Sequence, residues 1–378
     1  MNQTLASPPA PAGLTGTALF DLLARSWTLE APVASVTLDT AGKAAGFALA
    51  DGRLALVPLD DPDSPMQRIR LELDSGRSTI RQREKPVAPP VYTENLGGTA
   101  AMVAASGKIG FLAAAADGRV WRVTPRGQVI PLSREARPLS ALATDGRGLV
   151  ALAQEGKVDL LEEEGMTRRV GLLTAGAATA LAFAPDGQSL AVRLAEGVLL
   201  WPPGQEAVLL PFPGSGPVAF SAGGGWLAAS DGDQGLWLYR RADGSFGQIG
   251  NFRAPPLSMT FGAGDATLFA GGAFRLAGWS LDTPPLDGGQ SGALRSGRSG
   301  LVLVERVAAH PDRDLVAFGT AEGAVALVRP GLPDEMLLCP GDGAAITALH
   351  WSACGLHLAI GTAAGGAALV TLPPRLFK

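Results

Sequence analysis

The stretch that decides the fold is LAFAPDGQSLAVRLAEGVLLW, residues 181–201. It contains three short apolar or alternating runs, each of strand length. Pro185-Asp186-Gly187 separates the first run from the second, and Glu196-Gly197 separates the second from the third. Glycine accepts positive φ and acidic side chains bond to nearby backbone, so both separators predict tight turns. The stretch therefore predicts three antiparallel strands joined by two turns.

The same pattern occurs eight times along the chain. The first run of each copy closes at Leu38, Val103, Ala143, Phe183, Phe220, Phe261, Ala309 and Trp351. The third run of each copy reaches Val57, Val123, Leu161, Trp201, Tyr239, Trp279, Val328 and Val370. The two positions lie 18 to 20 residues apart in every copy. Most links between copies leave room for one more strand, and four strands in about 40 residues are typical of a β-propeller blade.

These spacings predict an all-β chain, a closed β-propeller of four-stranded blades that spans residues 16–376. Eight blades are favoured, and seven remain the alternative if the first or sixth copy is misread. Stacking in a ring covers the two faces that a single blade leaves open. The last copy ends near Leu372 without room for a fourth strand, whereas residues 26–29 have the pattern of a strand. We therefore expect the N-terminal strand to close the last blade. Residues 1–15 are predicted to be a disordered tail.

Two links between copies are long. Residues 61–90 form a charged insertion with the pattern of a hairpin, and its arms are expected to project into solvent. Its basic residues make it a candidate docking site for an acidic partner, and the alternative is a solvated hairpin; the candidates are Arg68, Arg70, Arg81 and Arg83. Residues 284–298, rich in proline and glycine, predict a flexible loop.

Composition excludes several classes of protein. The chain has 378 residues, is 47% hydrophobic and 17% charged, and carries a net charge of −4. This balance disfavours nucleic-acid binding, because no basic surplus exists to hold a phosphate backbone. No apolar run approaches the roughly 20 residues that span a bilayer, so we expect no membrane insertion. The N-terminus does not resemble a signal peptide and only two cysteines occur, which favours the cytoplasm. The preference for arginine, alanine and glycine is typical of a GC-rich bacterial genome.

One unit carries a specific family resemblance. Phe183-x-Pro185-Asp186-Gly187-x-x-Leu190-Ala191, followed by Leu200-Trp201, resembles the WD40-repeat family. Trp201, Tyr239 and Trp279 fall at the position of that family's terminal tryptophan, and the resemblance covers residues 32–372. It implies a propeller that binds proteins or peptides. The chain departs from the family in having no Gly-His dipeptide, no Trp-Asp dipeptide and only three histidines. The family's histidine-centred hydrogen-bond network is therefore absent from most blades.

The acidic residues beside the second turns are the most regular polar feature. If the family's strand order holds, they lie on one face around the central opening, where they are candidates to bind a basic peptide or a cation. The simpler interpretation is that they only close tight turns. The six residues are Asp51, Asp117, Glu155, Glu196, Asp233 and Glu322. Trp226 and Trp237 are candidates for an interaction hot spot, although most tryptophans at strand positions are packing residues.

The sequence contains no catalytic constellation that we recognise. His310-Pro311-Asp312 falls at a first turn, far in sequence from His350 and His357, whereas a metal site needs three or four ligands that converge. The glycine-rich stretches match no nucleotide-binding fingerprint. We therefore predict no metal, no cofactor and no enzymatic activity, and a protein-interaction scaffold as the function. The alternatives are a propeller hydrolase or lactonase with a metal in the central channel, and a structural subunit of a larger assembly.

Overall fold

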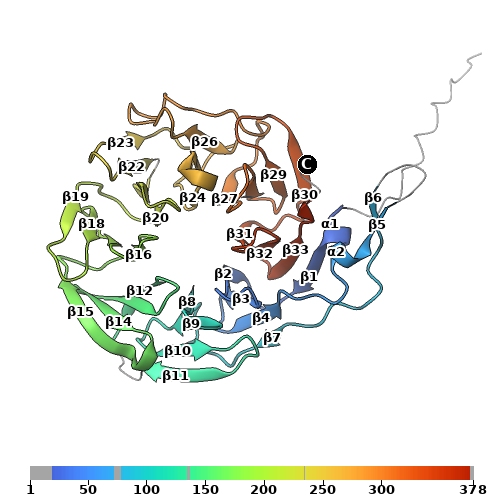
Figure 1. The fold of residues 1–378 in the computed structure, drawn as a ribbon, viewed down its shortest axis with the longest axis horizontal. Helices are drawn as coiled ribbons and strands as arrows, with labels where there is room; N and C mark the ends of the chain where they lie inside the picture. Colours follow the sequence, from blue (N-terminus) through green and yellow to red (C-terminus); the bar gives the residue numbers. More distant parts are fainter. Residues whose placement is uncertain (1–18, 72–77, 134–136, 234, 375–378) are drawn as a thin grey trace, which may run out of the picture.

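The chain forms a closed ring of eight blades, as Figure 1 shows. The structure is a computed structural model that describes residues 19–71, 78–133, 137–233 and 235–374. The predicted propeller and its favoured count of eight blades are both confirmed. The predicted disordered tail, residues 1–15, lies outside the described residues.

Each blade places its first strand next to the central opening (Figure 1). The inner strands are β2 (Val33–Leu38), β8 (Met102–Ala105), β12 (Leu139–Thr144), β16 (Ala180–Phe183), β20 (Val218–Phe220), β24 (Met259–Phe261), β27 (Val304–Ala309) and β31 (Ile346–Trp351). We number the blades 1 to 8 in this order. Neighbouring inner strands contact one another around the whole ring, and β31 contacts β2 to complete it.

The next two strands of each blade follow outward in antiparallel order. The second strands are β3 (Ala44–Leu49), β9 (Phe111–Ala114), β13 (Leu149–Gln154), β17 (Leu190–Arg193), β21 (Trp226–Ser230), β25 (Thr267–Ala270), β28 (Val316–Thr320) and β32 (His357–Thr362). The third strands are β4 (Leu54–Pro58), β10 (Val120–Val123), β14 (Lys157–Glu162), β18 (Val198–Trp201), β22 (Leu236–Arg240), β26 (Ala277–Ser280), β29 (Val325–Val328) and β33 (Gly366–Thr371). The two runs after the first turn of every sequence copy are thus strands.

The outer strands are more variable than the inner three. They are β7 (Val91–Tyr92), β11 (Val129–Ser133), β15 (Thr167–Leu173), β19 (Val208–Leu210), β23 (Phe246–Ile249), β30 (Glu335–Cys339) and, in blade 8, β1 (Ala24–Thr28). Outside the blades lie α1 (Leu19–Leu23), α2 (Pro65–Arg68), β5 (Ile69–Leu71) and β6 (Ser78–Ile80). The short helices η1 (Glu164–Met166) and η2 (Ala263–Asp265) lie in turns within blades 3 and 6.

Blade 6 departs from the predicted four strands. Its sheet contains only β24, β25 and β26, and its outer position is taken by a single bridge between Trp279 and Ala293. The backbone N–H of Leu294 donates to the carbonyl of Gly278 at 2.8 Å, which secures this bridge. The residues predicted as a flexible loop, 284–298, therefore lie along the outer edge of blade 6. The sixth sequence copy, which has Phe274-Arg275 in place of an acidic-glycine turn, is the copy that lacks a regular fourth strand.

The first turn of blade 4 has the geometry that the sequence predicted. In blade 4 the backbone N–H of Gly187 donates to the carbonyl of Ala184 at 2.9 Å, and Gly187 has a φ of +69°. The Asp186 carboxylate accepts the N–H of Gln188 at 2.8 Å. A left-handed φ is strained for residues with a Cβ, so glycine is the natural residue there. The turn reverses the chain between β16 and β17.

The N-terminal strand closes the ring as predicted. β1 pairs antiparallel with β33, from Ala24 opposite Val370 to Thr28 opposite Gly366. Leu23, just before β1, is 1% exposed and belongs to an apolar cluster that also contains residues of blades 7 and 8. The last blade is therefore built from both ends of the chain.

The core lies between adjacent blades. In one cluster Val158 and Leu160 of blade 3 pack with Val192 and Trp201 of blade 4, and all four side chains are buried. Each such layer removes apolar surface from water on both sides, which ties the stability of a blade to its neighbours. In the described part of the chain, every helix is too short or too polar to cross a membrane.

Candidate interaction surfaces

The six predicted acidic residues lie on one face of the ring. Each sits between the second and third strands of its blade, and the same strand order in every blade brings these turns to the same side. We call this side the turn face. The turns lie between the second and third strands, one strand outward from the inner strands. They form a ring around the central opening.

Asp51 and Asp117 are held inside their own turns. The carboxylate of Asp51 accepts the backbone N–H of Arg53 at 3.1 Å and pairs with its guanidinium at 2.6 Å. Asp117 makes the same contacts with Arg119, at 3.1 and 2.8 Å. The side-chain hydrogen bond from Arg53 is the main cause that lowers the pKa of Asp51, and the backbone N–H of Arg119 is the main cause that lowers that of Asp117. Their charges are therefore compensated locally.

The other candidates on the turn face differ from these two. Glu155, Glu196 and Glu322 are exposed, and their carboxylates make no hydrogen bond or ion pair with other residues that the structure describes. Asp233 is also exposed, but the turn bonds of blade 5 go to Asp231, which accepts the N–H of Asp233 and of Gly235 at 2.9 Å each. The exposed glutamates are thus the acidic groups best placed to meet a partner.

The insertion contains a polar network at the junction of blades 1 and 8. The side chain of Arg25, on β1, is buried and reaches across to the end of β4. Its Nη2 donates to the carbonyl of Pro58 at 2.6 Å and of Leu59 at 3.1 Å, and its Nη1 donates to that of Asp60 at 3.3 Å. The guanidinium also lies 3.8 Å from the Asp61 carboxylate. We call this network, Arg25 with Asp61, Asp63, Arg68 and Arg83, the closure clamp.

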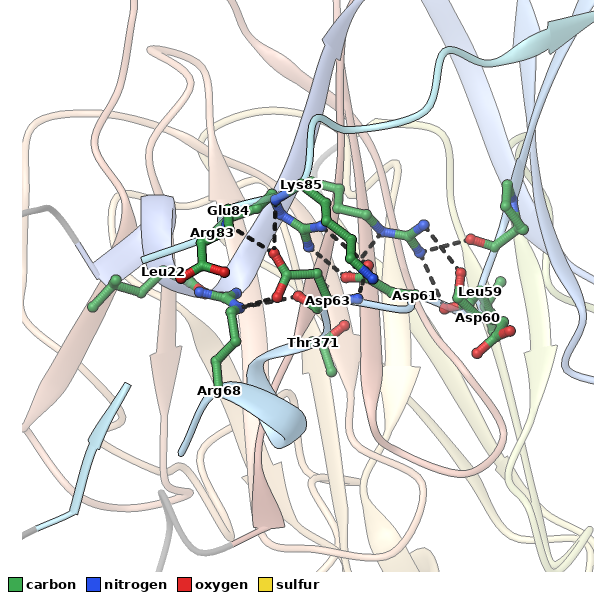
Figure 2. A network of polar contacts seen from close by, with 12 residues as sticks. Leu22, Leu59, Asp60, Asp61, Asp63, Arg68, Arg83, Glu84, Lys85 and Thr371 are labelled. Atoms are coloured by element: carbon green, nitrogen blue, oxygen red, sulfur yellow. Dashed lines mark hydrogen bonds and ion pairs between the residues drawn. The ribbon is translucent and has the colours of Figure 1, made fainter. Parts of the chain in front are cut away.

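Figure 2 shows how the acidic half of the closure clamp is arranged. Both carboxylate oxygens of Asp61 accept hydrogen bonds from the guanidinium of Arg83. The Asp63 carboxylate accepts the backbone N–H of Glu84 at 2.9 Å and of Lys85 at 3.2 Å. Burial opposes ionisation of Asp61, but its hydrogen bonds and the nearby arginine charges outweigh burial and lower its pKa. The pair therefore stays charged and hydrogen-bonded, the state in which buried charges are tolerated.

Arg68 ties the insertion to the N-terminal helix. Its Nε donates to the carbonyl of Asp63 at 3.0 Å, and its two Nη atoms donate to the carbonyls of Arg81 and Leu22. Only 2% of Arg68 is exposed. The prediction that Arg68 is offered to an acidic partner is therefore wrong, because this guanidinium already satisfies three backbone carbonyls in the interior.

The other arginines of the insertion divide in the same way. Arg83 is mostly buried against Asp61 and is not free for a partner. Arg70 and Arg81 are exposed, and Arg81 pairs with Glu84 at 2.9 Å. Among the four candidate arginines, the expected projection into solvent is thus correct for Arg70 and Arg81 and wrong for Arg68 and Arg83. The buried side chains, Arg68 and Arg83, hold the insertion against the N-terminal segment.

The two tryptophan candidates are partly buried in blade 5. Trp237 stacks on Phe212 with ring centroids 5.1 Å apart, and its indole N–H donates to the carbonyl of Pro213 at 3.2 Å. Trp226 packs against the apolar cluster of blades 5 and 6, and the Arg240 guanidinium lies 5.0 Å from its ring centroid. Both rings are used for packing, and each leaves part of its surface accessible.

The central opening offers little chemistry. A cavity of about 330 Å³ lies against the inner strands of blades 6, 7 and 8, and His350 is the one titratable group that lines it. Among the described residues, no group of three or more His, Cys, Asp or Glu side chains is placed to hold a metal. The metal-dependent hydrolase alternative thus has no candidate ligand set in this part of the chain.

His310 has a structural setting in place of a catalytic one. Its ring packs at a tilt of 58° against Trp351 with centroids 4.9 Å apart, and its Nδ1 accepts the backbone N–H of Asp312 at 3.1 Å. Burial is the main cause that lowers its pKa. The Trp351 indole N–H in turn donates to the carbonyl of Ala308 at 3.0 Å, so this pair joins the first turns of blades 7 and 8.

Sequence reasoning missed the residues that fasten the blades. Arg25 lies in a strand whose pattern signals pairing only, and its acceptors are more than 30 residues away. Arg193, on β17, is fully buried and donates to the carbonyls of Phe212 and Ser230. The sequence offered one signal, an arginine within the apolar run of an internal strand. Such an arginine is buried, and its guanidinium therefore needs hydrogen-bond acceptors in the interior.

Comparisons with known proteins support the fold alone. No family model matches the sequence, and no curated protein matches it. Among solved structures, the C-terminal WD40 domain of Sif2 has a TM-score of 0.63 at 13% identity, covering 93% of this chain and 99% of that one. The computationally designed Ika8 protein has a TM-score of 0.62 at 15% identity, over 91% and 98% of the two chains. The WD40 repeats of RRP9 have a TM-score of 0.56 at 14% identity, over 94% and 99%. The chain thus has the fold of a WD40-type β-propeller, with eight blades.

Proposed function

We propose that this chain is a non-catalytic scaffold that binds proteins or peptides. The observation that carries the proposal is the double closure of the ring, by β1 on β33 and by the closure clamp. A frame fixed in this way holds its loops in constant positions, which lowers the entropy lost when a partner binds. The solved structures of similar fold include WD40 domains, which agrees with this use of the ring.

The turn face is the surface that we propose for a first partner. Its exposed carboxylates, Glu155, Glu196 and Glu322, suit a basic segment, and Asp233 adds negative charge beside them. Asp51 and Asp117 are weaker candidates, because Arg53 and Arg119 compensate their charges. Arg70 and Arg81 of the insertion, and the accessible parts of Trp226 and Trp237, are secondary candidates. We further propose a cytoplasmic setting, because Cys339 and Cys354 are both free thiols.

Affinity capture with matched face variants tests the scaffold function. The immobilised full-length chain is compared with the triple variant E155A/E196A/E322A and with K108A/R126A, which alters exposed groups away from the turn face. We expect a partner at constant stoichiometry that the triple variant loses and the control variant keeps. Recovery of no such partner by any form of the chain, or a metal-dependent hydrolytic activity of the purified protein, would contradict the proposal.

A further inference from the structure

Blade 6 gives the turn face one patch with a different character. Its second-to-third turn, residues 271–276, has no acidic residue and carries Phe274 and Arg275 in place of an acidic-glycine pair. The flanking connections, residues 250–258 and 299–303, also lack Asp and Glu, and the first of them contains Arg253. We call these three segments the blade 6 patch. The neighbouring turns carry Asp233 in blade 5 and Glu322 in blade 7, so the patch separates two acidic turns.

Backbone hydrogen bonds join the three segments into one surface. The N–H of Arg253 donates to the carbonyl of Gly272 at 2.8 Å, and the N–H of Gly272 donates to that of Val304 at 2.8 Å. The N–H of Gly300 donates to the carbonyl of Phe274 at 3.0 Å. The side chains that these segments present are therefore held close together on a fixed base.

The patch exposes large apolar side chains. Leu301 is 93% exposed, Leu257 is 53% exposed and Phe274 is 42% exposed. Leu301 is the most exposed large apolar side chain among the described residues. Single exposed apolar residues are ordinary, whereas three on hydrogen-bonded neighbouring segments mark an interaction site.

The positive charge of the patch has little local compensation. Arg253 is exposed, and no carboxylate among the described residues pairs with it or with Arg275. The Nε of Arg275 is buried without a hydrogen-bond acceptor. The nearest acidic side chain on the adjoining inner strand is Glu305, which lies 3.7 Å from the guanidinium of Arg306 and is engaged there. The exposed Arg253 thus offers donors that a carboxylate ligand can satisfy, whereas the Nε of the half-buried Arg275 lies in the interior.

We propose that the blade 6 patch binds an acidic peptide segment that carries bulky apolar side chains. Its carboxylates face Arg253 and Arg275, and its apolar side chains cover Leu301, Leu257 and Phe274. This inference rests on the proposed scaffold function and specifies one class of partner. A peptide suits the patch better than a nucleic acid, because the exposed groups are largely aliphatic and the net charge of −4 repels a phosphate backbone.

Selection from a phage-displayed library of random 12-residue peptides tests the assignment. The purified full-length chain is the target, and the R253E/L301S variant is used for counterselection. Both residues are exposed, and circular dichroism verifies that the variant keeps the fold. We expect the enriched peptides to contain several Asp or Glu residues together with Leu, Phe or Trp. Enrichment without an excess of acidic residues, or no enrichment relative to the variant, would overturn the proposal.

Synthetic copies of the enriched peptides then give affinities by fluorescence anisotropy. We expect R253E to weaken binding by about fivefold or more, because it places like charges together. L301S should weaken it by about tenfold, as expected for losing one buried leucine contact. The matched controls R126E and L337S, which make the same changes at exposed positions elsewhere, should leave the affinity unchanged.

Two further outcomes separate this proposal from the scaffold function. A 12-nucleotide single-stranded DNA that binds as tightly as the peptides, and that R253E displaces, would overturn the assignment to a peptide. A captured partner that presents an acidic apolar segment, and whose binding R253E/L301S leaves intact, would also overturn it, while the scaffold function would stand. Peptides selected as predicted, without any captured partner of the full-length chain, would support the patch and contradict the broader scaffold proposal.

Discussion

At Gly118 the turn between β9 and β10 brings the backbone against the next connection. Gly118 has a φ of +100°, and a Cβ placed there would lie 2.2 Å from the carbonyl oxygen of Arg137. Gly187 has a φ of +69° in the first turn of blade 4, where the nearest atom to such a Cβ would be a flexible arginine nitrogen at 3.7 Å. The two glycines therefore look alike in the sequence, but only Gly118 is required by a close approach of neighbouring backbone as well as by its positive φ.

We expect G118A to destabilise the protein far more than G187A. The strain of a positive φ alone should cost G187A about 1 kcal/mol. G118A adds a collision with backbone that cannot move without disturbing the blade, so its loss should be about 3 kcal/mol or more. Urea denaturation of both variants measures the difference. Equal losses would show that the close approach at Gly118 relaxes without cost.

Two partly or fully buried histidines predict how stability depends on pH. Burial is the main cause that lowers the pKa of His310 and of His357, and that of His357 falls from 6.5 to about 4. Between these values the unfolded chain binds a proton at His357 and the folded chain does not. The free energy of unfolding should therefore decrease as pH falls from 6.5 to 4, by about 2 kcal/mol for this partly exposed ring.

Urea denaturation at a series of pH values from 7.5 to 4 checks this dependence. The variant H357N keeps a polar partner for Thr371, whose hydroxyl lies 3.1 Å from the His357 Nδ1. We expect it to flatten the slope between pH 6.5 and 4. Asp61, whose pKa is lowered below the ordinary 3.8, contributes only in more acidic solution. An unchanged slope in H357N would contradict the assignment to His357.

Among the structural elements, the insertion gains a role that its sequence pattern does not indicate. The hairpin arms β5 and β6 pair as expected, but the preceding residues fold back over β1 and α1. Asp61 and Asp63 are each 6% exposed, so the charged stretch that looked solvent-facing is half interior. The insertion therefore acts as a fastener for the N-terminal segment.

We expect R25A to destabilise the ring by about 3 kcal/mol, because it leaves buried carbonyls and the Asp61 charge without their partner. The matched control is R119A, which removes an exposed arginine paired with Asp117 and should cost less than about 1 kcal/mol. Urea denaturation compares the two variants. Similar small losses would mean that the closure clamp does not hold the ring.

The sequence could predict the features that depend on local periodicity, but not the long-range contacts of the closure clamp. The strands and turns of each blade follow from local periodicity, as in Phe183 to Trp201, so eight blades and the closing strand were predictable. Arg25 reaches Pro58, 33 residues away, and Arg68 reaches Leu22, 46 residues away, and no local pattern encodes such contacts. The acidic turns were located correctly, but their distance from the central opening depends on strand order, which the sequence does not report.

On the scale of the whole molecule, residues 19–28 connect three blades. Leu23 packs with Leu338 of blade 7 and with Trp351 of blade 8, and β1 supplies the outer strand of blade 8. Arg25 adds the link to blade 1 through the carbonyl of Pro58. The ring is closed only when each blade is joined to the next. Because this short segment completes the junction at blade 8, we expect it to control the cooperativity of unfolding of the entire propeller.

A chain that begins at residue 31 should therefore lose stability throughout the ring. It lacks the buried side chains of Leu23 and Leu29 and the ladder on β33, a loss on the order of 5 kcal/mol. We expect a lower and broader thermal transition. A synthetic peptide of residues 19–30 should restore the midpoint as its concentration rises, since it binds only the folded ring. A scrambled peptide should have no effect. An unchanged midpoint in the shortened chain would mean that seven blades and an open eighth suffice, and that closure by β1 is not what unifies the molecule.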